Sequence, residues 1–95
     1  MKRLEAYISV ARSFNAGLKI NSDLKVVEKP KNDDGNEGFA EYVFNDGVII
    51  RHSWDGGTYG FGYKDYDHSI EVVNDGGYEF EQKSLSYFMK KSKRL

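Results

Sequence analysis

The residues with the greatest chemical potential lie in one stretch, SWDGGTYGFGYKDYDHS, at positions 53–69. It combines five aromatic residues, three aspartates, four glycines and one histidine. Aromatic residues in such a setting stack on nucleic acid bases, and carboxylates beside an imidazole can hold a metal ion. The same composition is also typical of one strand of a sheet that buries its aromatic side.

Alternation over 58–65 favours the buried strand. Tyr59, Phe61 and Tyr63 would point to one side of the strand, with small or polar residues between them. A chain of 95 residues offers no other candidate for the sheet side of its core, so we expect this aromatic row to be buried. Neighbouring strands would add apolar side chains to the same face: Tyr42, Phe44, Ile70, Val72, Tyr78 and Phe80.

The segment GFGYKDY, residues 60–66, resembles the first ribonucleoprotein motif of RNA-recognition domains, whose aromatic residues stack on bases. The matching positions are Gly60, Phe61, Gly62, Tyr63 and Tyr66. Tyr59 stands where that motif has Lys or Arg, and Lys64 stands where it has an aliphatic residue. Direct RNA or DNA binding is therefore our second hypothesis.

Metal binding and catalysis receive less support. Asp65, Asp67 and His68 lie close together, and His52 and Asp55 flank Trp54. Turns rich in acidic residues bring such groups together without a ligand, so we expect both histidines at the surface or at a sheet edge. The sequence has no nucleophile–base motif, phosphate-cradling loop or HExxH pattern, and we predict no enzymatic activity, no cofactor and no metal.

Charge is distributed in three blocks. Residues 1–32 carry seven basic and three acidic residues, residues 33–82 carry two and twelve, and residues 83–95 carry five and none. The net charges are +4, −10 and +5, which give the overall −1. Such separation predicts that the protein selects its partner electrostatically.

Composition also bears on location. The absence of cysteine excludes disulfides, catalytic thiols and thiolate metal sites. The start, MKRLEAYISVARSF, alternates polar and apolar residues and predicts neither a signal peptide nor a membrane span. We expect a soluble cytoplasmic protein.

The patterns predict a single α+β domain, residues 1–95. A helix over 1–18 would carry an apolar stripe that includes Leu4, Ile8 and Phe14, with Gly17 at its end. Residues 24–82 would form a five- or six-stranded antiparallel meander with acidic turns, and residues 84–95 a short basic helix with Leu85, Phe88 and Met89 inward. Both helices would pack on one face of the sheet.

The predicted strands are 24–28, 39–45, 48–54, 58–65, 69–74 and 78–82, with a loop at 29–38 and turns at NDG 45–47, DGG 55–57 and NDGG 74–77.

The acidic middle supplies the predicted interface. Carboxylates on alternate residues of a strand lie roughly 6.6 Å apart, so a sheet face can present a row of negative charge to a basic groove. Large aromatic residues in turns would anchor a partner. We predict partner contacts at Glu41, Glu71, Glu79 and Glu81 on the face opposite the aromatic row, Asp33, Asp34, Asp46 and Asp75 in loops, Trp54 beside a turn, and Tyr66 in the loop after the aromatic strand.

The stretch FAEYVFNDGVIIRHSWDGGTYGFGYKDYD, residues 39–67, is similar to the central hairpins of a type I-F anti-CRISPR protein. The similarity lies in the spacing of Tyr42, Phe44, Asp46, Val48, Ile49 and Tyr59. It implies a phage-encoded inhibitor that acts in the bacterial cytoplasm, binds a Cas protein or effector complex, and blocks access of nucleic acid. The basic ends of this chain depart from the uniformly acidic character of that family.

Other hypotheses remain open. An immunity protein against a nuclease toxin would use the same acidic surface, and a long exposed edge strand would allow a homodimer. An interaction domain with no inhibitory role is a further hypothesis. Direct nucleic acid binding would use the basic ends: Lys2, Arg3, Arg12, Lys90, Lys91, Lys93 and Arg94.

Overall fold

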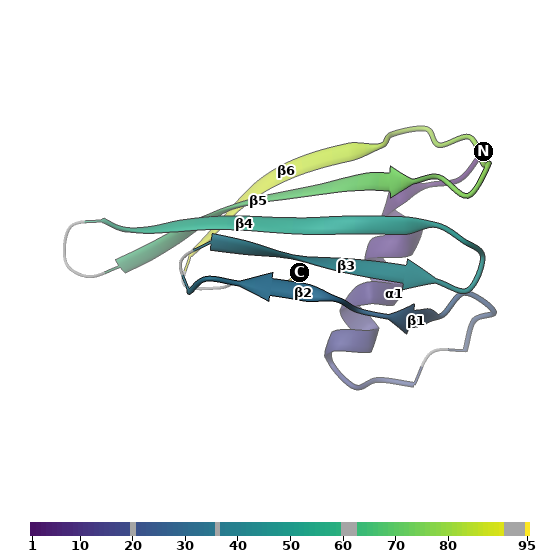
Figure 1. Cartoon of the computed structure of the whole chain (residues 1–95), viewed down its shortest axis with the longest axis horizontal. Coiled ribbons are helices and arrows are strands. Elements are labelled where there is room, and N and C mark those ends of the chain that lie inside the picture. Colours follow the sequence, from purple (N-terminus) through teal and green to yellow (C-terminus); the bar gives the residue numbers. More distant parts are fainter. Residues whose placement is uncertain (20, 36, 60–62, 91–94) are drawn as a thin grey trace.

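In a computed structural model of the protein, the described residues form one helix and a six-stranded antiparallel sheet (Figure 1). The structure describes residues 1–19, 21–35, 37–59, 63–90 and 95, with the backbone alone for 57–59, 63–65 and 89–90. The α+β class and the antiparallel sheet are thus confirmed. The elements are α1 (Leu4–Asn15), β1 (Val26–Glu28), β2 (Lys31–Asp33), β3 (Glu37–Phe44), β4 (Ile49–Tyr59), β5 (Tyr63–Asn74) and β6 (Ser84–Lys90).

Strands β3 to β6 form a meander, in which each strand pairs with the next one along the chain. Strands β1 and β2 both pair with β3 on its other side, so together they form an interrupted edge. The long β4–β5 hairpin makes the molecule elongated, with extents of 44 × 26 × 19 Å. Of the described residues, none forms a helix long and apolar enough to cross a membrane.

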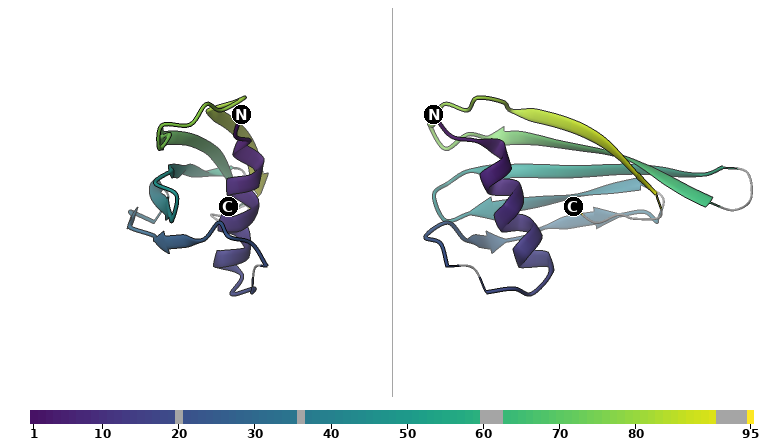
Figure 2. Two further views of the ribbon diagram at one scale, coloured as in Figure 1. Left: turned by 90° about the vertical axis from the view of Figure 1, so that its right-hand side faces the viewer. Right: turned by 180° about the vertical axis from the view of Figure 1, so that it is seen from behind.

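Helix α1 crosses one face of the sheet, as the two views in Figure 2 show. Leu4, Tyr7, Ile8 and Ala11 recur at helical spacing and are buried against the strands, as the apolar stripe predicts. Gly17 follows the helix with a φ of 68°, a conformation that glycine adopts without steric cost. The stripe ends earlier than predicted, because the last turn of α1 passes beyond the sheet edge (Figure 2). Phe14 and Leu18 are accordingly 44% and 64% exposed.

The two faces of the sheet differ sharply in composition. Ala40, His52 and Ile70 occupy one cross-strand row and are buried on the face that α1 crosses, here called the helix face. Alternate residues point away from α1. In the described part of the chain no helix covers this second side (Figure 2). We call it the open face and define it by Glu37, Phe39, Glu41, Arg51, Ser53, Asp55, Asp67, Ser69, Glu71, Ser86 and Phe88.

The predicted C-terminal helix is wrong, because residues 84–90 form strand β6. Leu85 and Tyr87 pack against the core, whereas Ser84, Ser86 and Phe88 are exposed. This alternation has a period of two, and pairing with β5 satisfies the backbone groups of the segment. Phe88 misled the prediction, because it joins Leu85 and Met89 at helical spacing while its side chain lies outside the core.

The predicted turn at DGG 55–57 is also wrong. These residues stay within β4, where Asp55, Gly56 and Gly57 pair with 65–67 of β5. Glycine fits here because the Tyr66 ring lies against Gly56, a place that a side chain would occupy. The two turns that contain NDG are confirmed, with φ values of 93° at Gly47 and 64° at Gly76.

Other boundaries also move. The predicted strand 78–82 is a connection with one isolated bridge, between Phe80 and Lys2. The predicted loop at 29–38 contains β2, and its Lys31–Asp33 segment pairs with β3. Phe61 and the side chains of Tyr59 and Tyr63 lie outside the described residues, so burial of the aromatic row stays a prediction.

A hydrogen bond from Tyr7 connects α1 to the β3–β4 turn. We expect Tyr7→Phe to lower the free energy of unfolding by about 2 kcal/mol. The buried Tyr7 hydroxyl donates to Asp46 Oδ2 at 2.5 Å, and Asp46 Oδ1 accepts from the Val48 amide at 3.0 Å. Burial and this bond to Asp46 raise the pKa of Tyr7. Urea denaturation would measure the loss. The control is Tyr78→Phe at a more exposed tyrosine; equal midpoints for both variants would contradict the prediction.

Candidate functional site

Carboxylates line up across the strands of the open face. Glu37 of β3 lies opposite Asp55 of β4, and Asp55 lies opposite Asp67 of β5. Neighbouring strands are about 4.8 Å apart, so the three carboxylates form a compact row. Within the described residues none of the three has an ion-pair partner. We call Glu37, Asp55 and Asp67 the acidic row.

A second cross-strand row contains both signs of charge. Glu41, Arg51 and Glu71 are opposite one another in register. Arg51 donates from Nη2 and Nε to Glu41 Oε2 at 2.7 and 3.0 Å, and its guanidinium lies 4.8 Å from the centre of the Phe39 ring. One positive charge therefore stands between two negative charges, and the row keeps a net charge of −1.

An open hollow of about 490 Å³ lies beside the acidic row. Asp55 and Asp67 line it together with the hydroxyl-bearing residues Ser53, Ser69 and Ser86. Phe88, 57% exposed, forms its apolar wall. Negative charge, hydroxyl groups and one accessible aromatic ring thus meet on the open face, and this is a chemistry suited to binding a protein surface.

The four predicted glutamates do not form one row. Glu41 and Glu71 share the open face as predicted. Glu79 and Glu81 lie in the connection after β5, beside the start of α1. There the Lys2 amide donates to the Glu79 carbonyl at 2.7 Å, and Arg3 Nε lies 3.4 Å from Glu81 Oε2.

The predicted loop aspartates are mostly engaged in local structure. Asp46 accepts a hydrogen bond from the Tyr7 hydroxyl inside the fold. Asp75 lies 3.2 Å from Lys83 Nζ, and its pKa is lowered by the Gly77 amide and by Lys83. Asp33 belongs to β2 and accepts from the Gly35 amide at 2.8 Å, while Asp34 is exposed next to it. Asp34 lies beside the acidic row, because it lines a hollow together with Glu37 and its amide donates to the Glu37 carbonyl at 2.9 Å. The four aspartates therefore do not form one surface, and Asp34 alone is shown next to the acidic row.

Trp54 and Tyr66 are 6% and 4% exposed and lie within strands, so the turn predicted beside Trp54 and the loop predicted at Tyr66 are wrong. Both side chains belong to long strands and point to the helix face, because β4 and β5 continue through the expected turns. Asp55 was expected in the DGG turn, and Asp67 in the connection between the predicted strands 58–65 and 69–74, so neither was predicted on the open face. The alternation WDG in β4 and YDH in β5 is the sequence signal that could have placed them outward.

The histidines are also buried, contrary to the expectation of a surface or edge position. His52 Nε2 and His68 Nδ1 lie 2.7 Å apart, so the two imidazoles satisfy each other by a hydrogen bond. His68 stacks on Tyr87, with ring centres 4.5 Å apart. Burial lowers the pKa of His52 to about 4, with further contributions from His68, Lys29 and Arg12.

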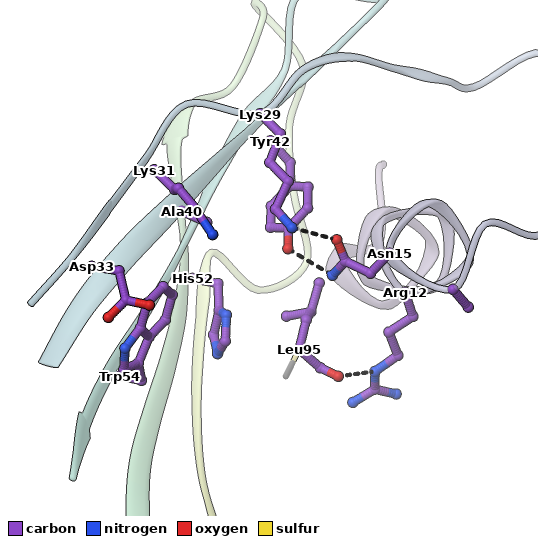
Figure 3. A pocket seen from close by; sticks show the side chains of 11 residues that line it. Arg12, Asn15, Lys29, Lys31, Asp33, Ala40, Tyr42, His52, Trp54 and Leu95 are labelled. Carbon is purple, nitrogen blue, oxygen red and sulfur yellow. Dashed lines mark hydrogen bonds between the residues drawn. The ribbon is translucent and has the colours of Figure 1, made fainter. Parts of the chain in front are cut away.

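The basic residues are divided among separate places. Lys2 and Arg3 lie at the start of α1, beside Glu79 and Glu81. Arg12 lies near the other end of α1, where its Nε donates to the Leu95 carbonyl at 3.2 Å (Figure 3). Lys90 is described by its backbone alone, and Lys91, Lys93 and Arg94 lie outside the described residues. Whether the two basic ends converge stays untested.

Metal binding gains no support from the described residues, where no three potential ligands converge on one point. Comparisons with protein families, with curated proteins and with solved structures find no match to the chain. The outer edge of β6 pairs with no strand in the described structure, and a homodimer through this edge stays a prediction.

Proposed function

We propose that the protein is a non-enzymatic binding protein that inhibits a larger nucleic-acid-handling protein through its open face. The observation that supports this is the acidic row, Glu37, Asp55 and Asp67. Like charges placed directly opposite each other in a sheet are destabilising by some tenths of a kcal/mol per pair. Lys and Arg side chains of a partner would neutralise the carboxylates, so binding would relieve their mutual repulsion.

A groove that binds nucleic acid is the kind of partner surface that fits. Such grooves gather Lys and Arg to neutralise phosphates, and a row of carboxylates competes for the same cations. Phe88 would add apolar contact beside the charges. Association would be fast at low salt and would weaken as salt rises, because the charges steer the encounter.

The most concrete form of this proposal is an anti-CRISPR protein in the bacterial cytoplasm that binds a Cas protein or effector complex. An immunity protein against a nuclease toxin would use the same surface. The identity of the bound protein separates these two forms.

Affinity capture from a bacterial lysate that contains an active CRISPR–Cas complex tests the proposal. Tagged protein is incubated with lysate that has or has not been treated with nuclease, and bound proteins are identified by mass spectrometry. We expect a Cas protein or another nucleic-acid-binding protein that survives nuclease treatment. Recovery of nucleic acid alone, lost on digestion, would contradict the proposal and favour direct RNA or DNA binding.

A further inference from the structure

A cavity of about 810 Å³ lies on the helix face, at the end of α1 (Figure 3). It is on the opposite side of the sheet from the acidic row. Its volume lies within the usual range for sites that bind small molecules. The C-terminal end of α1, the β1–β2 edge, β3 and β4 all contribute to its wall.

Positive charge predominates around this cavity. Among the described residues that line it, Arg12, Lys29 and Lys31 are basic and Asp33 is the one acidic residue. Leu95 also lines it, and its main-chain oxygen accepts from Arg12. The Lys31 side chain makes no ion pair with any other described residue, and burial and Lys31 lower the pKa of Lys29. Cations held this close repel one another, and an anion bound between them would relieve the repulsion.

Aromatic rings form the floor. Tyr42, His52 and Trp54 line the cavity, and the centres of the His52 and Trp54 rings are 5.2 Å apart. Among the described residues Trp54 Nε1 is a buried donor with no hydrogen-bond acceptor. An unsatisfied buried donor is unusual in proteins.

Asn15 fixes the cation next to the aromatic floor. Its Nδ2 donates to the Tyr42 hydroxyl at 2.8 Å, and its Oδ1 accepts from Lys29 Nζ at 2.6 Å (Figure 3). Lys29 Nζ lies 5.3 Å from the centre of the Tyr42 ring. The Lys29 ammonium group is thus held in place before any ligand binds, and this lowers the entropic cost of binding.

We propose that this cavity binds a small aromatic anion of the size and chemistry of a nucleoside monophosphate. The base would enter the cavity beside Trp54, and the phosphate would contact Arg12, Lys29 and Lys31. Buried, neutral His52 stays within the floor and adds no charge. This site is independent of the inhibitory function, because it lies on the other face of the sheet.

Fluorescence titration tests the proposal on the full chain, since Trp54 is its only tryptophan. The probes are AMP, adenosine, inorganic phosphate and a mixed single-stranded oligonucleotide. We expect AMP to give a saturable change in Trp54 emission, and adenosine and phosphate each to bind at least tenfold more weakly. No saturable change with millimolar AMP, or binding of the oligonucleotide without binding of AMP, would overturn the proposal.

A second experiment reverses the charge of the lysines that line the cavity. The single variant Lys31→Glu should weaken AMP binding at least threefold. The double variant Lys29→Glu with Lys31→Glu should weaken it at least tenfold. The matched control is Lys19→Glu with Lys25→Glu, an equal change in charge at exposed lysines outside the cavity lining. Equal loss in the control would mean that net charge alone attracts AMP, and would overturn the assignment of the site. A native melting transition of each variant shows that the comparison is made between folded proteins.

Discussion

Gly56→Ala is expected to lower the free energy of unfolding by about 3 kcal/mol, which is at the upper end of the range for overpacked cores. Gly56 lies opposite Tyr66 in the β4–β5 ladder, and Tyr66 is buried against it. A Cβ atom at residue 56 would lie 3.0 Å or less from three atoms of the Tyr66 ring. Neither strand can yield easily, because both continue on either side of this pair. The ring would therefore leave its place in the core.

A double-mutant cycle with Tyr66→Leu tests this explanation. In the Tyr66→Leu background the ring is absent, so Gly56→Ala should cost less than about 1 kcal/mol. Urea denaturation of the four proteins gives the free energies of unfolding. Additive losses would contradict direct contact as the cause and would place the effect in the backbone of β4.

Acidification is the second large effect. The pKa of buried His52 is about 4, whereas that of an exposed histidine is about 6.5. Between these values the unfolded chain binds a proton that the folded protein excludes, so stability falls as the pH decreases from 6.5 to 4. The loss reaches roughly 3 kcal/mol at pH 4, at 1.36 kcal/mol per unit of pKa difference.

Urea denaturation between pH 7.5 and pH 4.5 measures this loss above the range in which most carboxylates titrate. The comparison variant is His52→Gln, whose amide can still form a hydrogen bond with His68 Nδ1 but does not titrate. We expect most of the pH dependence to disappear in this variant. Equal slopes for the two proteins, or a wild-type stability that is constant over the interval, would contradict the assignment to His52.

The sequence predicted the helix and the turns whose signals lie within a few neighbouring residues. The spacing of Leu4, Ile8 and Ala11 placed the core side of α1, and the NDG segments placed the turns at Gly47 and Gly76. Strand β6 was mistaken for a helix because Leu85, Phe88 and Met89 fit a helical stripe. The alternation of Ser84, Leu85, Ser86 and Tyr87 also fits a strand, and pairing with the edge of β5 decides between the two.

Long-range pairing explains the remaining differences. The DGG segment has turn chemistry, but Tyr66, ten residues away in sequence from Gly56, fills the space beside it. His52 has its hydrogen-bond partner sixteen residues away, and a single histidine in a polar sequence gives no sign that it is paired and buried. The WDG and YDH alternation places Asp55 and Asp67 outward when β4 and β5 are continuous strands, as the structure shows them to be.

Asp55→Lys with Asp67→Lys tests the role of the open face most directly, by quantitative affinity capture from nuclease-treated lysate. The control is Glu5→Lys with Asp23→Lys, which makes the same change in charge at exposed residues away from the open face. We expect recovery of the bound protein to fall at least tenfold for the open-face variant and to stay at the wild-type level for the control. Wild-type recovery should also fall as salt is raised. Equal recovery with all three proteins would contradict the open face as the interface.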